Sequence, residues 1–151
     1  MRTPALVLLL AATLASHAHA QSTRAERTGF RETSSLADVA AFLDTLSARS
    51  PDVRVTRLLT STEGRSVPLV IAARPLVRDA AEARRSGKPV VLVQANIHAG
   101  EIEGKEAALI LLRELALGSL RPLLDSLVLL VVPVYNADGN EALAAGEVNR
   151  P

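Results

Sequence analysis

The segment that most constrains the fold is residues 90–135, where two apolar runs flank a helical pattern. "VVLVQAN" and "SLVLLVVPVY" read as buried strands, and "EIEGKEAALILLRELALG" between them reads as a helix. A strand–helix–strand unit places its two strands parallel in one sheet, with the helix on a face. We expect the apolar stripe of this helix to comprise Ile102, Ala107, Ile110, Leu111 and Leu115.

The preceding residues add a helix and a hairpin. "SSLADVAAFLDTLSARS" has helical periodicity, and Ser35 with Asp38 three residues later forms a capping box at its start. Residues 53–72 read as two antiparallel strands joined by a turn at Glu63-Gly64. A hairpin that leads into a parallel unit predicts an α/β fold, with a mixed β-sheet and helices on both faces.

The first residues have the pattern of an export signal. "MRTPALVLLLAATLASHAHA" has a basic start, a short apolar run and a small-x-small ending, which indicates a signal peptide at residues 1–20. The apolar run is too short to span a bilayer core of about 30 Å. We therefore expect a secreted or periplasmic protein without a membrane span, in which residues 21–33 form an aperiodic linker and residues 34–151 form the main domain.

Composition excludes several classes of function. The aromatic residues are Phe30, Phe42 and Tyr135, and basic and acidic residues are equal in number once the leader is removed. A nucleic-acid partner is not expected, since no basic patch with aromatic residues is present. The chain has no cysteine, so neither a disulfide framework nor thiol chemistry is available.

The stretch "HAGEIEG" carries the candidate chemistry. His98 follows a predicted strand, and Glu101 falls in the first turn of the next helix. In open α/β sheets ligand sites collect at the carboxyl ends of strands, and His nitrogen with carboxylate oxygen is a common zinc-ligand pair. The alternative is a polar turn whose carboxylate only complements the helix dipole. Gly100 fits a bend with unusual dihedral angles, and Gly104 fits a fray point or a close packing contact.

Three segments together resemble the M14 family of zinc metallocarboxypeptidases. "STEGRSVPLV" is similar to the EGR turn of that family, "HAGEIEGKEA" to its zinc-ligand segment, and "VPVYNADGNE" to its Asn-Pro-Asp-Gly turn. The resemblance covers residues 34–151 and implies a phosphorylase/hydrolase-like zinc carboxypeptidase fold. It also implies a Zn²⁺ cofactor with His98 and Glu101 as two of its ligands.

The resemblance further implies a truncated domain. The third ligand of the family is a downstream histidine, its general base is a later glutamate, and an arginine stabilises the oxyanion; none has a matching position before Pro151. His17 and His19 lie in the leader, so His98 is the only histidine after residue 20. We therefore expect no catalytic residue besides the two metal ligands within this chain.

The chain departs from the family pattern at some positions. Ala137 replaces the proline of the Asn-Pro-Asp-Gly turn, and Gly100 stands where digestive carboxypeptidases have a basic residue. The pair Asn149-Arg150 is similar to a substrate-binding pair of the family, but it follows the turn too closely and stays unassigned. Arg65 reads as a turn residue.

Three functions remain open at this point. The resemblance favours a zinc exopeptidase that acts on peptides or proteins. The first alternative is a zinc amidohydrolase of the aspartoacylase or desuccinylase type, which acts on small acyl-amino acids. The second is a catalytically inactive fragment or binding module. The sequence does not assign substrate-binding residues or an oligomeric state.

Overall fold

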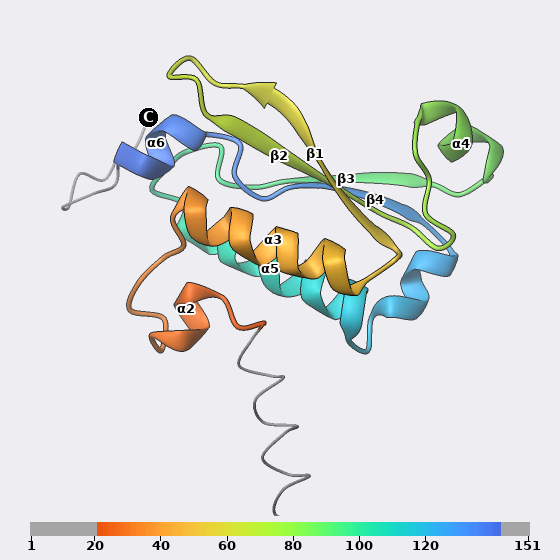
Figure 1. The fold of residues 1–151 in the computed structure, drawn as a ribbon, viewed down its shortest axis with the longest axis horizontal. Helices are drawn as coiled ribbons and strands as arrows, with labels where there is room; N and C mark the ends of the chain where they lie inside the picture. Colours follow the sequence, from red (N-terminus) through yellow and green to blue (C-terminus); the bar gives the residue numbers. More distant parts are fainter. Residues whose placement is uncertain (1–20, 143–151) are drawn as a thin grey trace, which may run out of the picture.

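The computed structural model describes residues 21–142, and its centre is one four-stranded mixed sheet (Figure 1). The strand order is β1-β2-β4-β3. Strands β1 and β2 form the predicted antiparallel hairpin, β2 also pairs antiparallel with β4, and β3 runs parallel to β4. The strands are β1 (Val53–Thr60), β2 (Ser66–Ala72), β3 (Val90–Gln94) and β4 (Val128–Val132). The mixed sheet predicted from the sequence is confirmed.

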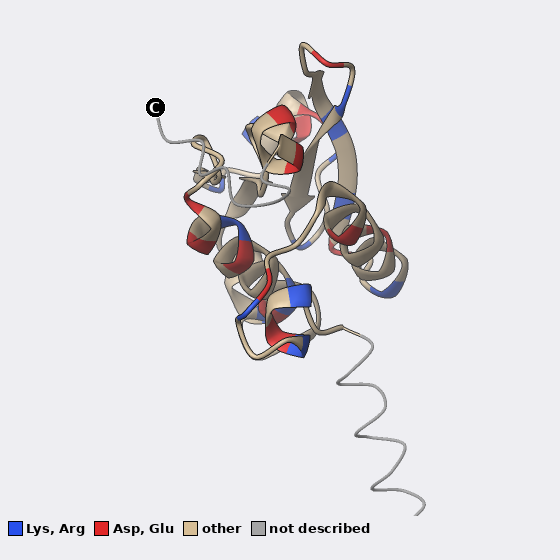
Figure 2. Ribbon diagram, turned by 90° about the vertical axis from the view of Figure 1, so that its left-hand side faces the viewer, with Lys and Arg blue, Asp and Glu red and all other residues tan. Residues whose placement is uncertain are grey.

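Two long helices cover one face of this sheet and lie side by side in Figure 1. Helix α4 packs through Ala83 against the opposite face, beside Val128 of β4. The short helix α6 lies at one end of the sheet, and α2 lies on the side of the long helices away from the sheet (Figure 1). Figure 2 shows acidic and basic residues interspersed along the helices. The helices are α2 (Arg24–Arg27), α3 (Leu36–Arg49), α4 (Ala80–Arg85), α5 (Ile102–Leu117) and α6 (Ala137–Ala142), with a 3-10 turn at Arg121–Asp125.

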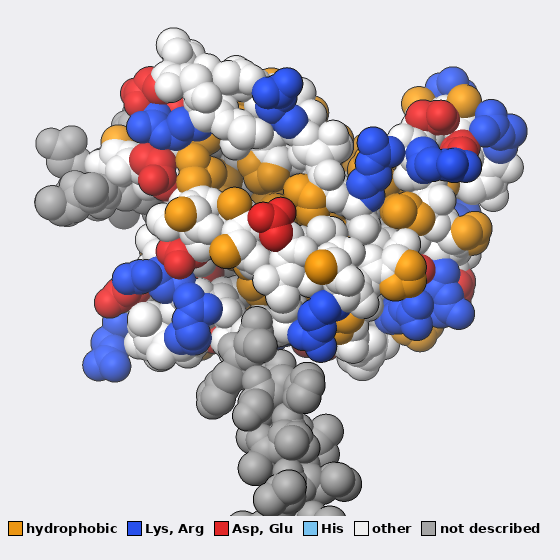
Figure 3. All heavy atoms as spheres, viewed as in Figure 1, with side chains coloured by type: hydrophobic (Ala, Val, Ile, Leu, Met, Phe, Trp, Pro, Cys, Tyr) orange, Lys and Arg blue, Asp and Glu red, His pale blue; other side chains and the backbone are white. Residues whose placement is uncertain are grey.

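Helix α3 begins as the sequence predicts. The Ser35 hydroxyl accepts a hydrogen bond from the Asp38 amide at 3.1 Å, and the Asp38 carboxylate accepts one from the Ser35 amide at 3.0 Å. Such a cap contributes about 1 kcal/mol to helix stability. Leu43 and Leu46 are then fully buried against the sheet, and burial of each contributes about 1.5–3 kcal/mol. Figure 3 shows apolar side chains in the groove between α3 and the β1–β2 hairpin.

Helix α5 buries a different face from the one predicted. Its buried apolar residues are Ala108, Leu109, Leu112, Leu115 and Ala116. Of the predicted stripe only Leu115 is buried; Ala107 is exposed, and Ile102, Ile110 and Leu111 are half-buried. The helix is apolar on most of its circumference, so its periodicity could not select the face that meets the sheet.

Residues 21–33 contain more structure than the aperiodic linker expected from the sequence. Thr23 and Glu26 form a capping box for α2. The Glu26 carboxylate accepts hydrogen bonds from both terminal nitrogens of Arg113 in α5, at 2.7 and 2.9 Å. The hydrogen bond from Arg113 lowers the pKa of Glu26 below its ordinary value. This segment is therefore fastened to the outer side of α5.

The remaining sequence expectations concern the Asn-Ala-Asp-Gly turn, the absence of a membrane span, and segments at the two ends of the chain. The Asn-Ala-Asp-Gly stretch begins the short helix α6 rather than a simple turn. Within residues 21–142, no helix is both long and apolar enough to cross a bilayer. The predicted signal peptide (1–20) and the pair Asn149-Arg150 lie outside the described residues.

Candidate metal centre

The candidate site lies where the parallel strands β3 and β4 end. Pairing continues past β3, because the Ala95 amide donates to Val132 O at 2.9 Å and the Tyr135 amide donates to Ala95 O at 3.1 Å. The Asn136 amide then donates to Asn96 O at 3.0 Å. The loops after β3 and β4 therefore leave the sheet side by side, at the edge where ligand sites of α/β folds form.

Asn96 shapes the loop that carries the candidate ligands. Its backbone is left-handed, with φ of 53°, a conformation that Asn tolerates better than most residues. Its side-chain amide nitrogen donates to the carbonyls of His98 and Ala99, both at 3.2 Å, and to Glu101 O at 3.4 Å. Asn96 therefore holds the bend through both its backbone conformation and its side chain. The sequence analysis missed this role, although Asn at a strand end before a bend is a recognisable signal.

His98 and Glu101, the predicted ligand pair, lie close together. His98 Nδ1 lies 3.1 Å from Glu101 Oε1, while the side chains are 44% and 67% exposed. The Nδ1 atom itself is sheltered from solvent and has no hydrogen-bond partner, so its approach to Glu101 is close but not aligned as a hydrogen bond. With the imidazole proton on Nε2, Nδ1 would be able to coordinate a metal ion together with the neighbouring carboxylate oxygen.

The spacing of these two atoms fits a shared metal ion. Ligands about 2.0–2.2 Å from zinc at tetrahedral angles lie about 3.3–3.6 Å apart, slightly farther than the observed separation of 3.1 Å. Imidazole and carboxylate are also ligands that zinc accepts. Among the residues that the structure describes, no group of three or more His, Cys, Asp or Glu could hold a metal. The described residues therefore offer a pair and not a complete three-ligand set.

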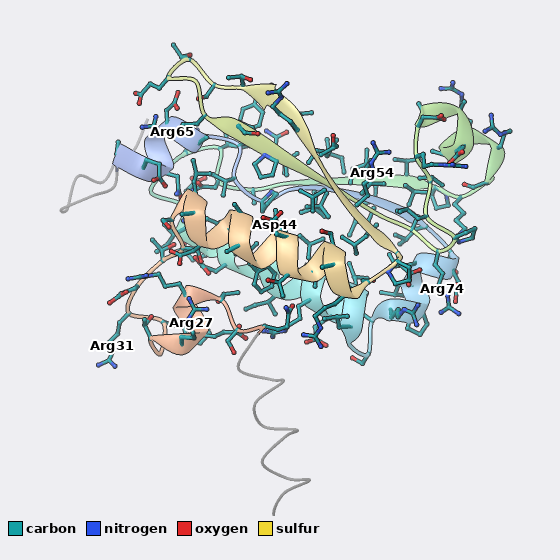
Figure 4. The ribbon with its side chains drawn as sticks, in the orientation of Figure 1. Arg27, Arg31, Asp44, Arg54, Arg65 and Arg74 are labelled. Atoms are coloured by element: carbon teal, nitrogen blue, oxygen red, sulfur yellow. The ribbon has the colours of Figure 1, made fainter. Side chains whose placement is uncertain are left out.

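The turn after β4 joins the hairpin to this end of the sheet. The Asp138 carboxylate accepts hydrogen bonds from Ser61 Oγ at 2.6 Å, from Arg65 Nη1 at 2.8 Å and from the Glu63 amide at 3.1 Å. The Ser61 hydroxyl, and after it Arg65, lower the pKa of Asp138 below its ordinary value. Arg65 lies at the hairpin end beside α6 (Figure 4) and is a structural ion-pair partner.

The same turn packs directly against the His98 loop. A Cβ atom added at Gly139 would lie 2.7 Å from Ala99 Cβ and 2.8 Å from Asn136 Nδ2. Only glycine allows this approach without a shift of the two loops. At Gly104 the corresponding atom would lie 3.5 Å from Ala95 Cβ, an ordinary contact distance. Gly104 of α5 therefore has room for a methyl group beside Ala95, the residue that follows β3, and the close packing contact predicted for it is not observed.

The comparison with known families agrees with the resemblance of the segments STEGRSVPLV, HAGEIEGKEA and VPVYNADGNE. The family model described as zinc carboxypeptidase matches residues 39–150. The chain belongs to the zinc carboxypeptidase family. No curated protein sequence matches it significantly.

Solved carboxypeptidases share the fold of this family member. The carboxypeptidase A from Helicoverpa armigera is 26% identical, with a TM-score of 0.60, over 71% of this chain and 25% of that one. A putative carboxypeptidase from Burkholderia mallei is 25% identical, with a TM-score of 0.58, over 71% and 27%. Bovine thrombin-activatable fibrinolysis inhibitor, 18% identical with a TM-score of 0.64 over 78% and 36%, shows likeness of fold alone. The chain thus spans only about a quarter to a third of the length of these structures.

A buried polar cluster supports the site in this carboxypeptidase-family chain. Lys105 of α5 is fully buried, and its ammonium donates to Ser34 O at 2.6 Å and to Asn140 Oδ1. Burial lowers the pKa of Lys105 below its ordinary value. The neighbouring Glu106 carboxylate accepts hydrogen bonds from the Ser34 amide at 2.6 Å and from Thr33 Oγ1 at 2.9 Å.

This cluster joins α6, α5 and the residues before α3, and the sequence analysis did not identify it. A signal was present, because Lys105 precedes Leu109 and Leu112 by four and seven residues and so shares their helix face. A lysine within an apolar stripe indicates a buried partner, since an unpaired buried charge is too costly.

Proposed function

We propose that His98 and Glu101 are two of the three protein ligands of a catalytic zinc ion in a metallocarboxypeptidase-type hydrolase. The observation that carries the proposal is the 3.1 Å approach of His98 Nδ1 to Glu101 Oε1 at the carboxyl end of β3. Zinc, when bound in such a site, polarises a scissile carbonyl and lowers the pKa of a bound water. Membership of the zinc carboxypeptidase family supports the assignment of this metal.

The chain contributes binding and orientation to the proposed reaction. The imidazole and the carboxylate hold the metal, and Asn96 fixes the loop on which both are carried. Glu103 lies exposed in the first turn of α5 and has no role in this assignment. A third ligand and a general base are not assigned among the residues described, so we expect residues 21–151 alone to hold zinc weakly and to hydrolyse no peptide.

We further propose the cellular setting and the substrate class. The family and its solved members support a peptide or protein substrate cleaved by an exopeptidase. The leader sequence supports removal of residues 1–20 and export to the periplasm or the medium. Residues 34–151 then form the amino-terminal portion of the peptidase domain, preceded by the attached segment 21–33.

Zinc titration of the exported chain tests the ligand assignment. We expect His98→Ala and Glu101→Ala each to weaken zinc affinity at least about tenfold, because even the partners that only orient ligands change affinity by about 10–100-fold. Glu103→Gln, made in the same helix turn, serves as the matched control and leaves affinity unchanged. A double variant of His98 and Glu101 that binds zinc like the parent would refute the assignment.

A substrate panel tests the activity. We compare peptides with free carboxyl termini, end-blocked peptides and N-acyl amino acids, first with residues 21–151 and then with a protein in which a complete domain is present. Hydrolysis of N-acyl amino acids alone by the complete domain would replace the exopeptidase with an amidohydrolase. Turnover by residues 21–151, sensitive to His98→Ala, would contradict the expectation that this chain alone is inactive.

A further inference from the structure

Gln21 becomes the first residue of the chain when the leader is removed as proposed. It follows the small-x-small signal Ala18-His19-Ala20 and begins the part of the molecule that the structure describes. Removal of the leader gives Gln21 a free α-amine, held on the same residue as its side-chain carboxamide. The amine and the carboxamide carbon of an amino-terminal glutamine are spaced so that they can close an unstrained five-membered ring.

The structure buries Gln21 against the two long helices. Only 4% of the residue is exposed. It lines a cavity of about 420 Å³ together with Arg49 at the end of α3 and with Arg113 and Glu114 of α5. Both polar atoms of its side chain, Oε1 and Nε2, are shielded from solvent and have no hydrogen-bond partner. Such a carboxamide is rare in folded proteins, where buried polar groups are almost always paired.

The backbone of Gln21 is held in this cavity by the body of the protein. Arg113 Nη1 donates to Gln21 O at 3.3 Å and to Glu26 Oε2 at 2.7 Å. The Glu26 carboxylate also accepts a hydrogen bond from the amide of Thr23, the residue that caps α2, at 2.8 Å. These contacts involve neither the leader nor the carboxyl-terminal end of the chain, so they remain when residues 1–20 are removed.

The charges that line the cavity are already balanced. They are those of two arginines, Arg49 and Arg113, and two glutamates, Glu26 and Glu114. An α-amine is largely protonated at neutral pH, so a free amino terminus at Gln21 adds a further positive charge to this set. A charge in a shielded site without a partner of its own is unfavourable. A neutral amino terminus therefore fits the cavity better than an ammonium group does.

Ring closure supplies such a terminus with atoms of Gln21 alone. The neutral α-amine nitrogen attacks the side-chain carboxamide carbon, Cδ, and forms the C–N bond of a lactam. The bond from Cδ to Nε2 breaks, and Nε2 leaves as ammonia with a proton from the amine. The reaction needs no oxidant, metal or second reactant. It removes both the charge of the amine and the unpaired Nε2 donor, and it leaves free the carbonyl oxygen that Arg113 contacts.

We propose that Gln21 of the exported chain is converted to pyroglutamate, and that this neutral ring occupies the cavity between α2, α3 and α5. The proposal rests on the proposed removal of residues 1–20, and it is independent of the zinc assignment because it uses neither His98 nor metal. Its consequence is an amino terminus without the free α-amine that ordinary aminopeptidases need, which protects an exported protein from degradation at this end.

Mass spectrometry of the amino-terminal peptide tests the modification. Free amines of the purified exported protein are labelled before digestion, so that a ring formed during handling is distinguished from one already present. We expect a peptide that starts at Gln21, lacks the label and is lighter than the glutamine form by one ammonia. A labelled peptide that starts at Gln21, still present after prolonged incubation of the protein, would overturn the proposal and leave removal of the leader intact. A peptide that starts at another residue would overturn both.

Gln21→Asn is the matched control for the chemistry. Asparagine keeps the carboxamide, but its side chain is one methylene shorter and can close only a smaller, strained ring with the amine. We therefore expect the amino-terminal peptide of this variant to carry the label. An unlabelled terminus in both proteins would show that the block does not arise from ring closure of glutamine, and would overturn the proposal.

Digestion by a pyroglutamyl aminopeptidase tests the position of the ring. This enzyme removes a terminal ring that it can reach, so we expect it to act at least about tenfold faster on the denatured protein than on the folded one. Arg113→Gln removes the hydrogen bonds to Gln21 O and Glu26 and should expose the ring of the folded protein. Arg49→Gln is the matched control, because Arg49 lines the same cavity but forms no hydrogen bond with Gln21 in the described structure. Equal rates for the folded and denatured parent would overturn the placement of the ring in the cavity.

Discussion

The two loops at the carboxyl ends of β3 and β4 lie side by side and use their polar residues in opposite ways. In the β4 loop, Asp138 and Asn140 are occupied by the hairpin and by Lys105. In the β3 loop, His98 and Glu101 approach only each other and remain largely exposed. The two loops are adjacent but differ in role. The polar side chains of the β4 loop are already hydrogen-bonded within the protein and stabilise the fold. Those of the β3 loop have few partners within the protein and remain available to bind a ligand.

We expect the largest change in the free energy of unfolding from removal of the buried Lys105 charge, which holds the β4 loop. Lys105→Met keeps the apolar stem but removes the donor for Ser34 O and Asn140 Oδ1. We expect the free energy of unfolding to fall by about 3 kcal/mol, because Asn140 Oδ1 loses its donor and Ser34 O keeps only a long hydrogen bond from Asn140 Nδ2. Urea denaturation measures this change.

Lys88 supplies the matched control for that experiment. It also donates to two carbonyls, Arg74 O and Leu124 O, but it is only half-buried. Lys88→Met should cost no more than about 1 kcal/mol. If both variants cost the same, the buried cluster is not what holds the β4 loop.

We expect an intermediate change in stability at Gly139, where the β4 loop contacts the β3 loop. Gly139→Ala places a methyl group against Ala99 and Asn136, so we expect a loss of about 1–3 kcal/mol from overpacking. Gly104→Ala adds the same methyl group at an ordinary contact distance and should be neutral or slightly stabilising. Thermal unfolding of the pair measures the difference, and equal melting temperatures would show that the contact between the loops is not tight.

The smallest effect on stability is expected at the candidate ligands. The double variant His98→Ala, Glu101→Ala should change the free energy of unfolding by less than about 1 kcal/mol, because both side chains are exposed and only a helix-dipole contribution of Glu101 is lost. Asp138→Ala, in the neighbouring loop, should lower the unfolding midpoint more. A double variant as unstable as Asp138→Ala would remove the distinction between the loops.

The sequence predicted the parts of the fold that follow from local pattern. The Ser35 cap, the hairpin, the parallel unit and the convergence of His98 with Glu101 all depend on residues close together in the chain. The partners of Lys105 could not be predicted from local pattern, because they lie 71 and 35 residues away in the sequence. The same is true of the attachment of residues 21–33 to α5, where Glu26 and Arg113 are 87 residues apart.

The strand order has a consequence for synthesis of the protein on the ribosome. Of the four strands in residues 21–142, β4 comes last in the sequence, yet it lies between β2 and β3. The hairpin can close early, but β3 cannot pair with its neighbour in this sheet until β4 has emerged. Throughout that interval its uncharged, apolar sequence is exposed in the nascent chain, and this is when a chaperone that binds extended apolar segments would have its best opportunity to act.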